Sequence, residues 1–181
     1  MINSNILYAS GILFYSRSMD GTPYFLLGRN LENKWEGFGG GCEISDKQDT
    51  ENTATREAWE ETLGCVGDID YLKKLVRNKD TKRLDSKTLT GKNYTLYIVK
   101  IPFNVNYREK FISTKKFISK IDVDKKFLEI NDIRWVSIET IQNSIFDKNN
   151  NLIKLRNVFE NTLKTYYEDI IFTINHKPGR F

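Results

Sequence analysis

The chain has 181 residues and a formal net charge of +4, with 39% hydrophobic and 13% aromatic residues. This length fits one domain with its own core, and the composition excludes a disordered chain. Two cysteines, Cys42 and Cys65, and a single histidine, His176, are too few for a disulfide framework or a zinc quartet. We therefore expect a reducing, cytoplasmic compartment, and neither a membrane span nor a signal peptide is indicated.

The first third of the chain predicts a hairpin followed by a glycine run. Ile6 to Tyr15 and Tyr24 to Gly28 have the composition of strands, and the turn residues Asp20 to Pro23 lie between them. The short apolar run Trp35 to Phe38 ends in three consecutive glycines, Gly39 to Gly41.

The rest of the chain predicts a mixed sheet with helices on both faces, an α/β/α sandwich with a C-terminal helix. A helix is expected from Thr50 to Leu63, with Gly64 at its C-terminal cap. The other expected strands are Tyr71 to Arg77, Tyr94 to Ile101 and Arg134 to Val136, and the other expected helices are Ile138 to Ile145 and an amphipathic one from Asn151 to Ile171.

A lysine-rich segment interrupts this pattern at about residues 106–128. It carries Lys115, Lys116, Lys120, Lys125 and Lys126, interleaved with apolar residues. A solvated basic face and an amphipathic helix packed on the sheet both fit this mixture. So does a lid whose charge attracts a polyanionic substrate.

The central helix carries an acidic cluster. Glu57, Glu60 and Glu61 stand at i, i+3 and i+4, so their side chains share one helix face. Like charges at this spacing repel, and a hard divalent cation such as Mg²⁺ removes the repulsion. A solvent-facing acidic helix is the alternative, but the preceding glycines, which let the backbone approach metal or phosphate, favour a site.

The stretch from Gly39 to Gly64 resembles the Nudix box. In that pattern a glycine is followed by five residues, a glutamate, seven residues, Arg-Glu-apolar-x-Glu-Glu and x-Gly-apolar. Gly40 fills the first position, and Arg56 to Glu61 match in order. Asp46 stands where the pattern has glutamate, nine residues instead of seven separate it from Arg56, and Gly64 comes one residue late. The resemblance covers about 140 residues and implies a single Nudix hydrolase domain, with the tail from about residue 150 forming a helix.

The resemblance implies a Mg²⁺- or Mn²⁺-dependent hydrolase that cleaves a diphosphate linkage by water attack on phosphorus. Glu57, Glu60 and Glu61 would ligate the metal with help from the Gly39 carbonyl, and Arg56 would hold Glu57. The general base is either a helix glutamate or Glu129, on the loop before the strand at Trp135. Substrate contacts are expected from six residues, namely Gly40, Glu43, Arg29, Trp35, Phe38 and Tyr8.

The box identifies the bond and leaves the molecule around it open. A small nucleotide is our first expectation and capped RNA the second. Dinucleoside polyphosphates, nucleotide sugars and diphosphoinositol polyphosphates are further alternatives. A non-catalytic nucleotide- or RNA-binding module is the alternative of another class, although no helix glutamate is lost and no RNA-binding motif stands out. Monomer and homodimer are both open.

Overall fold

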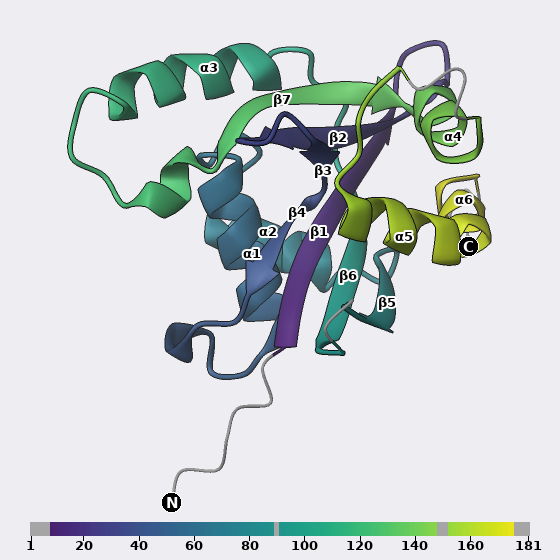
Figure 1. Cartoon of the computed structure of the whole chain (residues 1–181), viewed down its shortest axis with the longest axis horizontal. Coiled ribbons are helices and arrows are strands. Elements are labelled where there is room, and N and C mark those ends of the chain that lie inside the picture. The colour runs from purple at the N-terminus through teal and green to yellow at the C-terminus, as the bar shows by residue number, and fades with distance from the viewer. Residues whose placement is uncertain (1–7, 89–90, 148–151, 176–181) are drawn as a thin grey trace, which may run out of the picture.

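The computed structural model describes residues 8–88, 91–147 and 152–175 (Figure 1). The predicted strand start at Ile6, the predicted helix start at Asn151 and the tail with His176 lie outside these ranges. The described strands form one seven-stranded sheet. They are β1 (Tyr8–Arg17), β2 (Pro23–Asn30), β3 (Trp35–Glu36), β4 (Phe38–Gly41), β5 (Lys82–Lys87), β6 (Asn93–Lys100) and β7 (Ile130–Ser137).

The sheet is mixed, because β1 pairs in parallel with β6 while the other pairings are antiparallel. The predicted hairpin is confirmed as β1 and β2, with Phe14 opposite Leu26. Along the sheet the strands follow the order β3-β2-β1-β6-β5, with β4 also on β1 and β7 also on β2. β5 was not predicted, because in KRLDSK only Leu84 is a buried apolar residue.

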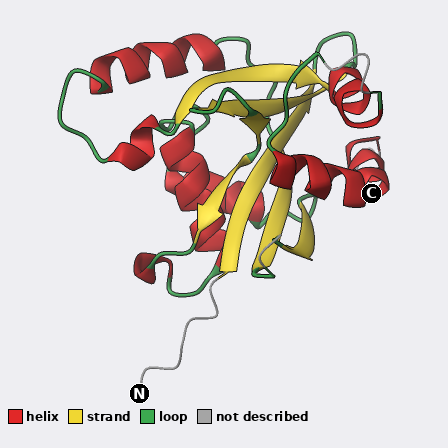
Figure 2. Cartoon of the chain, in the orientation of Figure 1, coloured by secondary structure: helices red, strands yellow, loops and turns green. Residues whose placement is uncertain are grey.

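Helices cover both faces of the sheet, as Figure 2 shows, so the predicted α/β/α sandwich is confirmed. Alternate strand residues divide the core: Ile12 and Phe14 face one layer, Leu13 and Tyr15 the other. The first layer contains α1 (Thr50–Glu61), α2 (Ile69–Val76) and α3 (Tyr107–Ile118), and the second contains α4 (Ile138–Phe146), α5 (Asn157–Thr165) and α6 (Tyr167–Asn175).

The central helix α1 begins as the sequence predicts. The Asp49 carboxylate accepts hydrogen bonds from the backbone N–H groups of Glu51 and Asn52, which caps the helix N-terminus. Ala54 and Ala58 are fully buried against the sheet. These small side chains bring α1 close to β1 and β4, so its acidic face lies beside the glycine strand.

Two predicted elements need correction. The predicted strand Tyr71 to Arg77 is wrong, because this segment lies in α2. Asp68 caps the N-terminus of α2, where its carboxylate accepts a hydrogen bond from the Tyr71 N–H. The predicted single helix from Asn151 to Ile171 is two helices, α5 and α6, separated at Tyr166. Before α5 the chain is extended, and Leu155 forms a parallel bridge with Trp35.

The lysine-rich segment contains α3, which packs against β7, and the short 3-10 helix η2 (Lys125–Leu128). The Lys115 ammonium is half-buried and donates to the carbonyl oxygens of Leu128 and Ile130 and to the Asn131 side chain. This lysine is therefore part of the packing between α3 and β7. Within the described ranges, no helix combines the length and the apolar character that crossing a membrane requires.

Candidate active site

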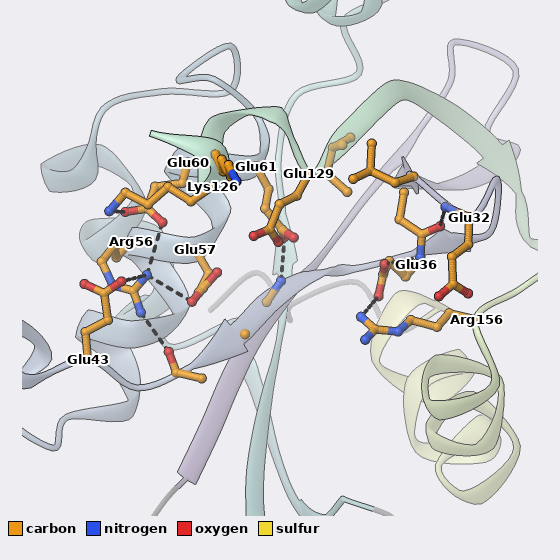
Figure 3. A pocket seen from close by; sticks show the side chains of 17 residues that line it. Glu32, Glu36, Glu43, Arg56, Glu57, Glu60, Glu61, Lys126, Glu129 and Arg156 are labelled. Carbon is orange, nitrogen blue, oxygen red and sulfur yellow. Dashed lines mark hydrogen bonds and ion pairs between the residues drawn. The ribbon is translucent and has the colours of Figure 1, made fainter. Parts of the chain in front are cut away.

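The acidic face of α1 and the glycine strand β4 border a cavity of about 580 Å³ (Figure 3). We call it the acidic cavity. Its charged lining comes from six regions of the chain that the fold brings together: the turn between β2 and β3, β3, the segment after β4, α1, η2 with Glu129, and the segment before α5. The charged residues are Glu32, Glu36, Glu43, Arg56, Glu57, Glu60, Glu61, Lys125, Lys126, Glu129 and Arg156.

The glycines of β4 are required for close approach. Gly39 lies opposite Gly11 of β1, and a Cβ on Gly39 would be 2.6 Å from the Gly11 Cα, so neither strand tolerates a side chain there. The Gly39 N–H donates to Glu61 Oε2 at 2.8 Å. A Cβ on Gly40 would lie 2.6 Å from Glu57 Oε1. Both carboxylates therefore rest against bare backbone.

Arg56 organises the acidic face of α1. Its Nη1 lies 2.9 Å from Glu57 Oε1 and 3.1 Å from Glu60 Oε2, and its Nη2 donates to the Gly41 carbonyl oxygen at 2.8 Å. Asp46 holds the other edge of the guanidinium, with Nε–Oδ1 and Nη2–Oδ2 distances of 2.9 Å. One arginine thus fixes two glutamates relative to the glycine strand.

The two departures from the Nudix box spacing fall in turns outside α1. Lys47 and Gln48, between Asp46 and the cap of α1, both have left-handed backbones, with φ of 55° and 58°. Leu63, the additional residue before Gly64, also has a positive φ of 54°. The lengthening therefore leaves the acidic face intact, and Asp46 reaches Arg56 despite its shorter side chain and greater separation.

The acidic cavity has an excess of negative charge, with seven carboxylates and four cationic side chains in its lining. Burial raises the pKa of Glu57 to about 7, with Glu60 and Glu129 adding to the rise and Arg56 opposing it. Burial also raises the pKa of Glu61 well above its usual value, and the nearby Glu57 and Glu36 add to the rise, while the hydrogen bond from the Gly39 N–H opposes it. Both carboxylates lack sufficient compensation for their charge.

A divalent cation fits this donor set. The oxygens of Glu57, Glu60 and Glu61 are the hard ligands that Mg²⁺ prefers, and a bound cation would compensate the excess of negative charge. The carboxylates do not yet converge: among the described residues, no three potential ligand side chains are already gathered around a single point. Arg56 and a lysine of η2, Lys126, occupy the Glu60 oxygens instead.

The remaining predicted site residues divide between this cavity and other places. Glu129 and Glu43 line the acidic cavity, and Glu43 Oε1 lies 3.5 Å from Arg56 Nη1. Arg29 lies 3.8 Å from the buried Asp132 and stacks on Trp35, and neither Arg29 nor Trp35 lines the cavity. The proposed substrate contacts of Arg29 and Trp35 thus find no support in this geometry.

Phe38 and Tyr8 also lie away from the acidic cavity. The Phe38 side chain is fully buried against Phe14, with ring centroids 5.7 Å apart, so the expected substrate contact is replaced by a core position. Tyr8 borders a second cavity of about 470 Å³ that the glycine strand also lines. This second cavity shares Glu36, Gly39, Gly40, Gly41 and Arg156 with the acidic one and adds Tyr94, Val158 and Phe159.

Two charged residues at the junction of the cavities were not predicted. Arg156 Nη1 donates to Glu36 Oε2 at 2.7 Å, and Asn30 donates to the other oxygen at 2.8 Å. Backbone hydrogen bonds between Trp35 and the chain at Lys154 and Arg156 fix this position. No sequence motif marks Arg156, because its place depends on a segment far from β3 in the chain.

Comparison with known proteins identifies the fold. No protein-family model matches the sequence, and no curated protein matches it either. Among solved structures, the Nudix hydrolase RenU from M. smegmatis has a TM-score of 0.51 and 13% identity, covering 93% of this chain and 89% of its own. The NUDIX domain of Shewanella oneidensis NrtR, complexed with ADP ribose, has a TM-score of 0.55 and 11% identity, covering 92% and 90%. The chain therefore has the fold of the Nudix hydrolases.

Proposed function

We propose that this protein is a divalent-metal-dependent hydrolase that cleaves a diphosphate linkage in a nucleotide-like substrate. The observation that carries the proposal is the acidic cavity, where three glutamates of α1 meet the glycine strand with an excess of negative charge. Glu60 and Glu61 are only 3% and 8% exposed beside this cavity, and buried glutamates of this kind are typical of functional sites.

Glu57, Glu60 and Glu61 would hold the metal, with the Gly39 carbonyl as an additional ligand. When bound, Mg²⁺ or Mn²⁺ supplies charge neutralisation for a diphosphate and lowers the pKa of a coordinated water. Arg56 orients Glu57 and Glu60 through its Nη1 atom. Gly40 and Gly41 leave the cavity wall free of side chains, so phosphate oxygens can approach the backbone.

Two carboxylates are candidates for accepting the proton of the attacking water. Glu129 lines the cavity close enough for its charge to raise the pKa of Glu57 and Glu61. Its carboxylate forms no hydrogen bond or ion pair with any residue that the structure describes. We favour Glu129, because Glu57 is engaged by Arg56 and is needed for the metal.

The second cavity supports a small nucleotide substrate. Tyr94, Val158 and Phe159 give it an apolar wall suited to a nucleobase, and it adjoins the acidic cavity at the glycine strand. A diphosphate over α1 would then carry its aromatic group into the second cavity. The related NrtR domain binds ADP ribose, which contains such a linkage.

The segment of about residues 106–128 would act as a lid within a single domain, since η2 brings Lys125 and Lys126 to the acidic cavity. These lysines are positioned for an anionic substrate. Only these two of the segment's lysines line the cavity among the described residues, which favours a compact polyphosphate over an extended RNA.

Hydrolysis of a substrate panel tests the proposal. Nucleoside triphosphates, dinucleoside polyphosphates, nucleotide sugars, diphosphoinositol polyphosphates and capped RNA are each incubated with Mg²⁺, Mn²⁺ or EDTA. We expect metal-dependent release of a phosphate-bearing product that Glu61→Gln abolishes. Glu51→Gln is the matched control, because Glu51 lies on the same helix and pairs with Arg77 outside the cavity. Nucleotide binding without turnover in every condition would instead identify a binding module.

A further inference from the structure

A lysine of η2 occupies the acidic cavity beside the glutamates of α1. Lys126 Nζ lies 2.7 Å from Glu60 Oε1, while Arg56 Nη1 lies 3.1 Å from the other oxygen, Oε2 (Figure 3). The Glu60 side chain is only 4% exposed, and that of Lys126 is 31% exposed. Both oxygens of this carboxylate are therefore taken by cationic side chains of the protein itself.

The backbone around Lys126 is anchored on both sides. Phe127 packs edge-on against Trp59 of α1, with ring centroids 5.7 Å apart and an interplanar angle of 83°. On the other side, the Lys115 ammonium ties α3 to the carbonyl oxygens of Leu128 and Ile130. The Lys126 ammonium is consequently held near Glu60. Its effective concentration at that carboxylate depends on the fold and is independent of the protein concentration.

We propose that Lys126 neutralises Glu60 until a divalent ion takes the place of the ammonium. Lys126 thereby sets the affinity of the cavity for metal. This inference rests on the metal-dependent function proposed above. Glu60 Oε1 cannot bind a metal while it accepts the ammonium, and two cations so close repel each other. Metal binding through Glu60 thus requires breaking this ion pair, which lowers the apparent affinity.

The neighbouring lysine offers a matched comparison. Lys125 carries the same charge and also lines the acidic cavity, but it forms no ion pair with any residue in the described part of the chain. Substituting Lys125 therefore reports the general effect of removing one positive charge. Substituting Lys126 adds the loss of direct competition at Glu60.

The test is calorimetric titration of the metal-free protein with Mn²⁺, without substrate. For Lys126→Gln we expect the Kd to fall by about tenfold, which corresponds to one ion pair of moderate strength. Lys125→Gln should change the Kd by less than about threefold, because solvent and salt screen an unpaired charge. Equal Kd values for wild type and Lys126→Gln, or no Mn²⁺ binding by either protein, would overturn the proposal.

Thermal unfolding separates this role from a structural one. In EDTA, Lys126→Gln should have a lower Tm than wild type, because Glu60 loses a counter-charge. In saturating Mn²⁺ the difference should vanish or reverse, whereas a lysine needed only for packing would lower the Tm equally in both. Neither of these two measurements contains substrate. If the substrate panel shows no hydrolysis while the Mn²⁺ titrations give the expected Kd values, the proposed activity is rejected and the exchange of Lys126 for metal at Glu60 still stands. The same Tm loss in both conditions would reject the exchange.

Discussion

Asp46 and Arg56 form a two-point ion pair beneath the acidic cavity, with both nitrogen–oxygen distances at 2.9 Å. Asp46 is only 3% exposed and also accepts hydrogen bonds from the Thr53 hydroxyl and the Glu43 N–H. These contacts hold the pKa of Asp46 below its usual value despite its burial, so it remains charged at neutral pH. The orientation of the glutamates on α1 thus depends on a residue of η1 (Ile44–Asp46).

Replacing Asp46 should destabilise the protein. We expect Asp46→Asn to lower the free energy of unfolding by about 2–4 kcal/mol, because it leaves the buried edge of Arg56 without a charged partner. Urea denaturation at pH 7 measures this value. Glu160→Gln removes a partly exposed ion pair with Lys164 and should cost less than about 0.5 kcal/mol. Similar losses for the two variants would contradict the buried role of Asp46.

Stability without metal should fall as the pH rises. Glu57 has a pKa of about 7 in the folded protein against 4.5 unfolded, so the unfolded chain loses its proton first. Protonated Glu57 therefore contributes ~3 kcal/mol to the free energy of unfolding. This contribution is complete below pH 4.5 and is lost as the pH rises to about 7. The Tm in EDTA should therefore decrease between pH 5 and pH 8.

Two comparisons identify the source of this pH dependence. Saturating Mg²⁺ should flatten the decrease, because the bound ion compensates the ionised carboxylates. Glu57→Gln should reduce the slope in EDTA, since the titrating group is removed. A wild-type Tm that is constant over this range in EDTA would contradict the environment described for Glu57.

A methyl group on Gly40 should weaken metal binding. The added Cβ would overlap the Glu57 carboxylate, the nearest oxygen being 2.6 Å away, and would displace it from the glycine strand. We expect Gly40→Ala to raise the Kd for Mn²⁺ by about tenfold or more. Gly41→Ala is the matched control, because its Cβ would meet nothing within 4 Å and the Kd should stay unchanged. Calorimetric titration decides between these outcomes.

The turn before α1 should gain stability from glycine. Gln48 is exposed and has a φ of 58°, a conformation that costs a residue with a Cβ about 1 kcal/mol. Gln48→Gly should therefore raise the free energy of unfolding by about 0.5 kcal/mol after the entropy of the unfolded chain is included. Ser45→Gly, in η1, should change stability in the opposite direction. Denaturation of both variants tests the sign.

The sequence was most informative where a pattern is local. The acidic face and the hairpin depend on residues close together in the chain, and the helix expected from Thr50 appears as α1. The strand predicted from Tyr71 failed because its apolar residues were interpreted without the preceding cap. Leu72, Leu75 and Val76 are at helical spacing, and Asp68 supplies the cap.

The sequence was least informative about contacts between distant segments. Arg156 reaches Glu36 only because residues near Leu155 join the sheet beside Trp35, and no local pattern encodes that bridge. Similarly, the lysine-rich segment suggested a basic surface, but the fold sends Lys115 into the protein and Lys126 into the cavity. Charge alone did not distinguish these two lysines from their exposed neighbours.

The parallel pairing of β1 with β6 has a consequence for folding order. Tyr8 pairs with Asn93, so this part of the sheet closes a long loop, whereas β1, β4 and α1 lie within one continuous stretch of the chain. Loop closure disfavours distant pairings in the early steps of folding. We expect pulsed hydrogen exchange during refolding to protect α1 before β6. The glutamates and the glycine strand would then assemble first, and the part of the second cavity that Tyr94 of β6 lines would be completed later.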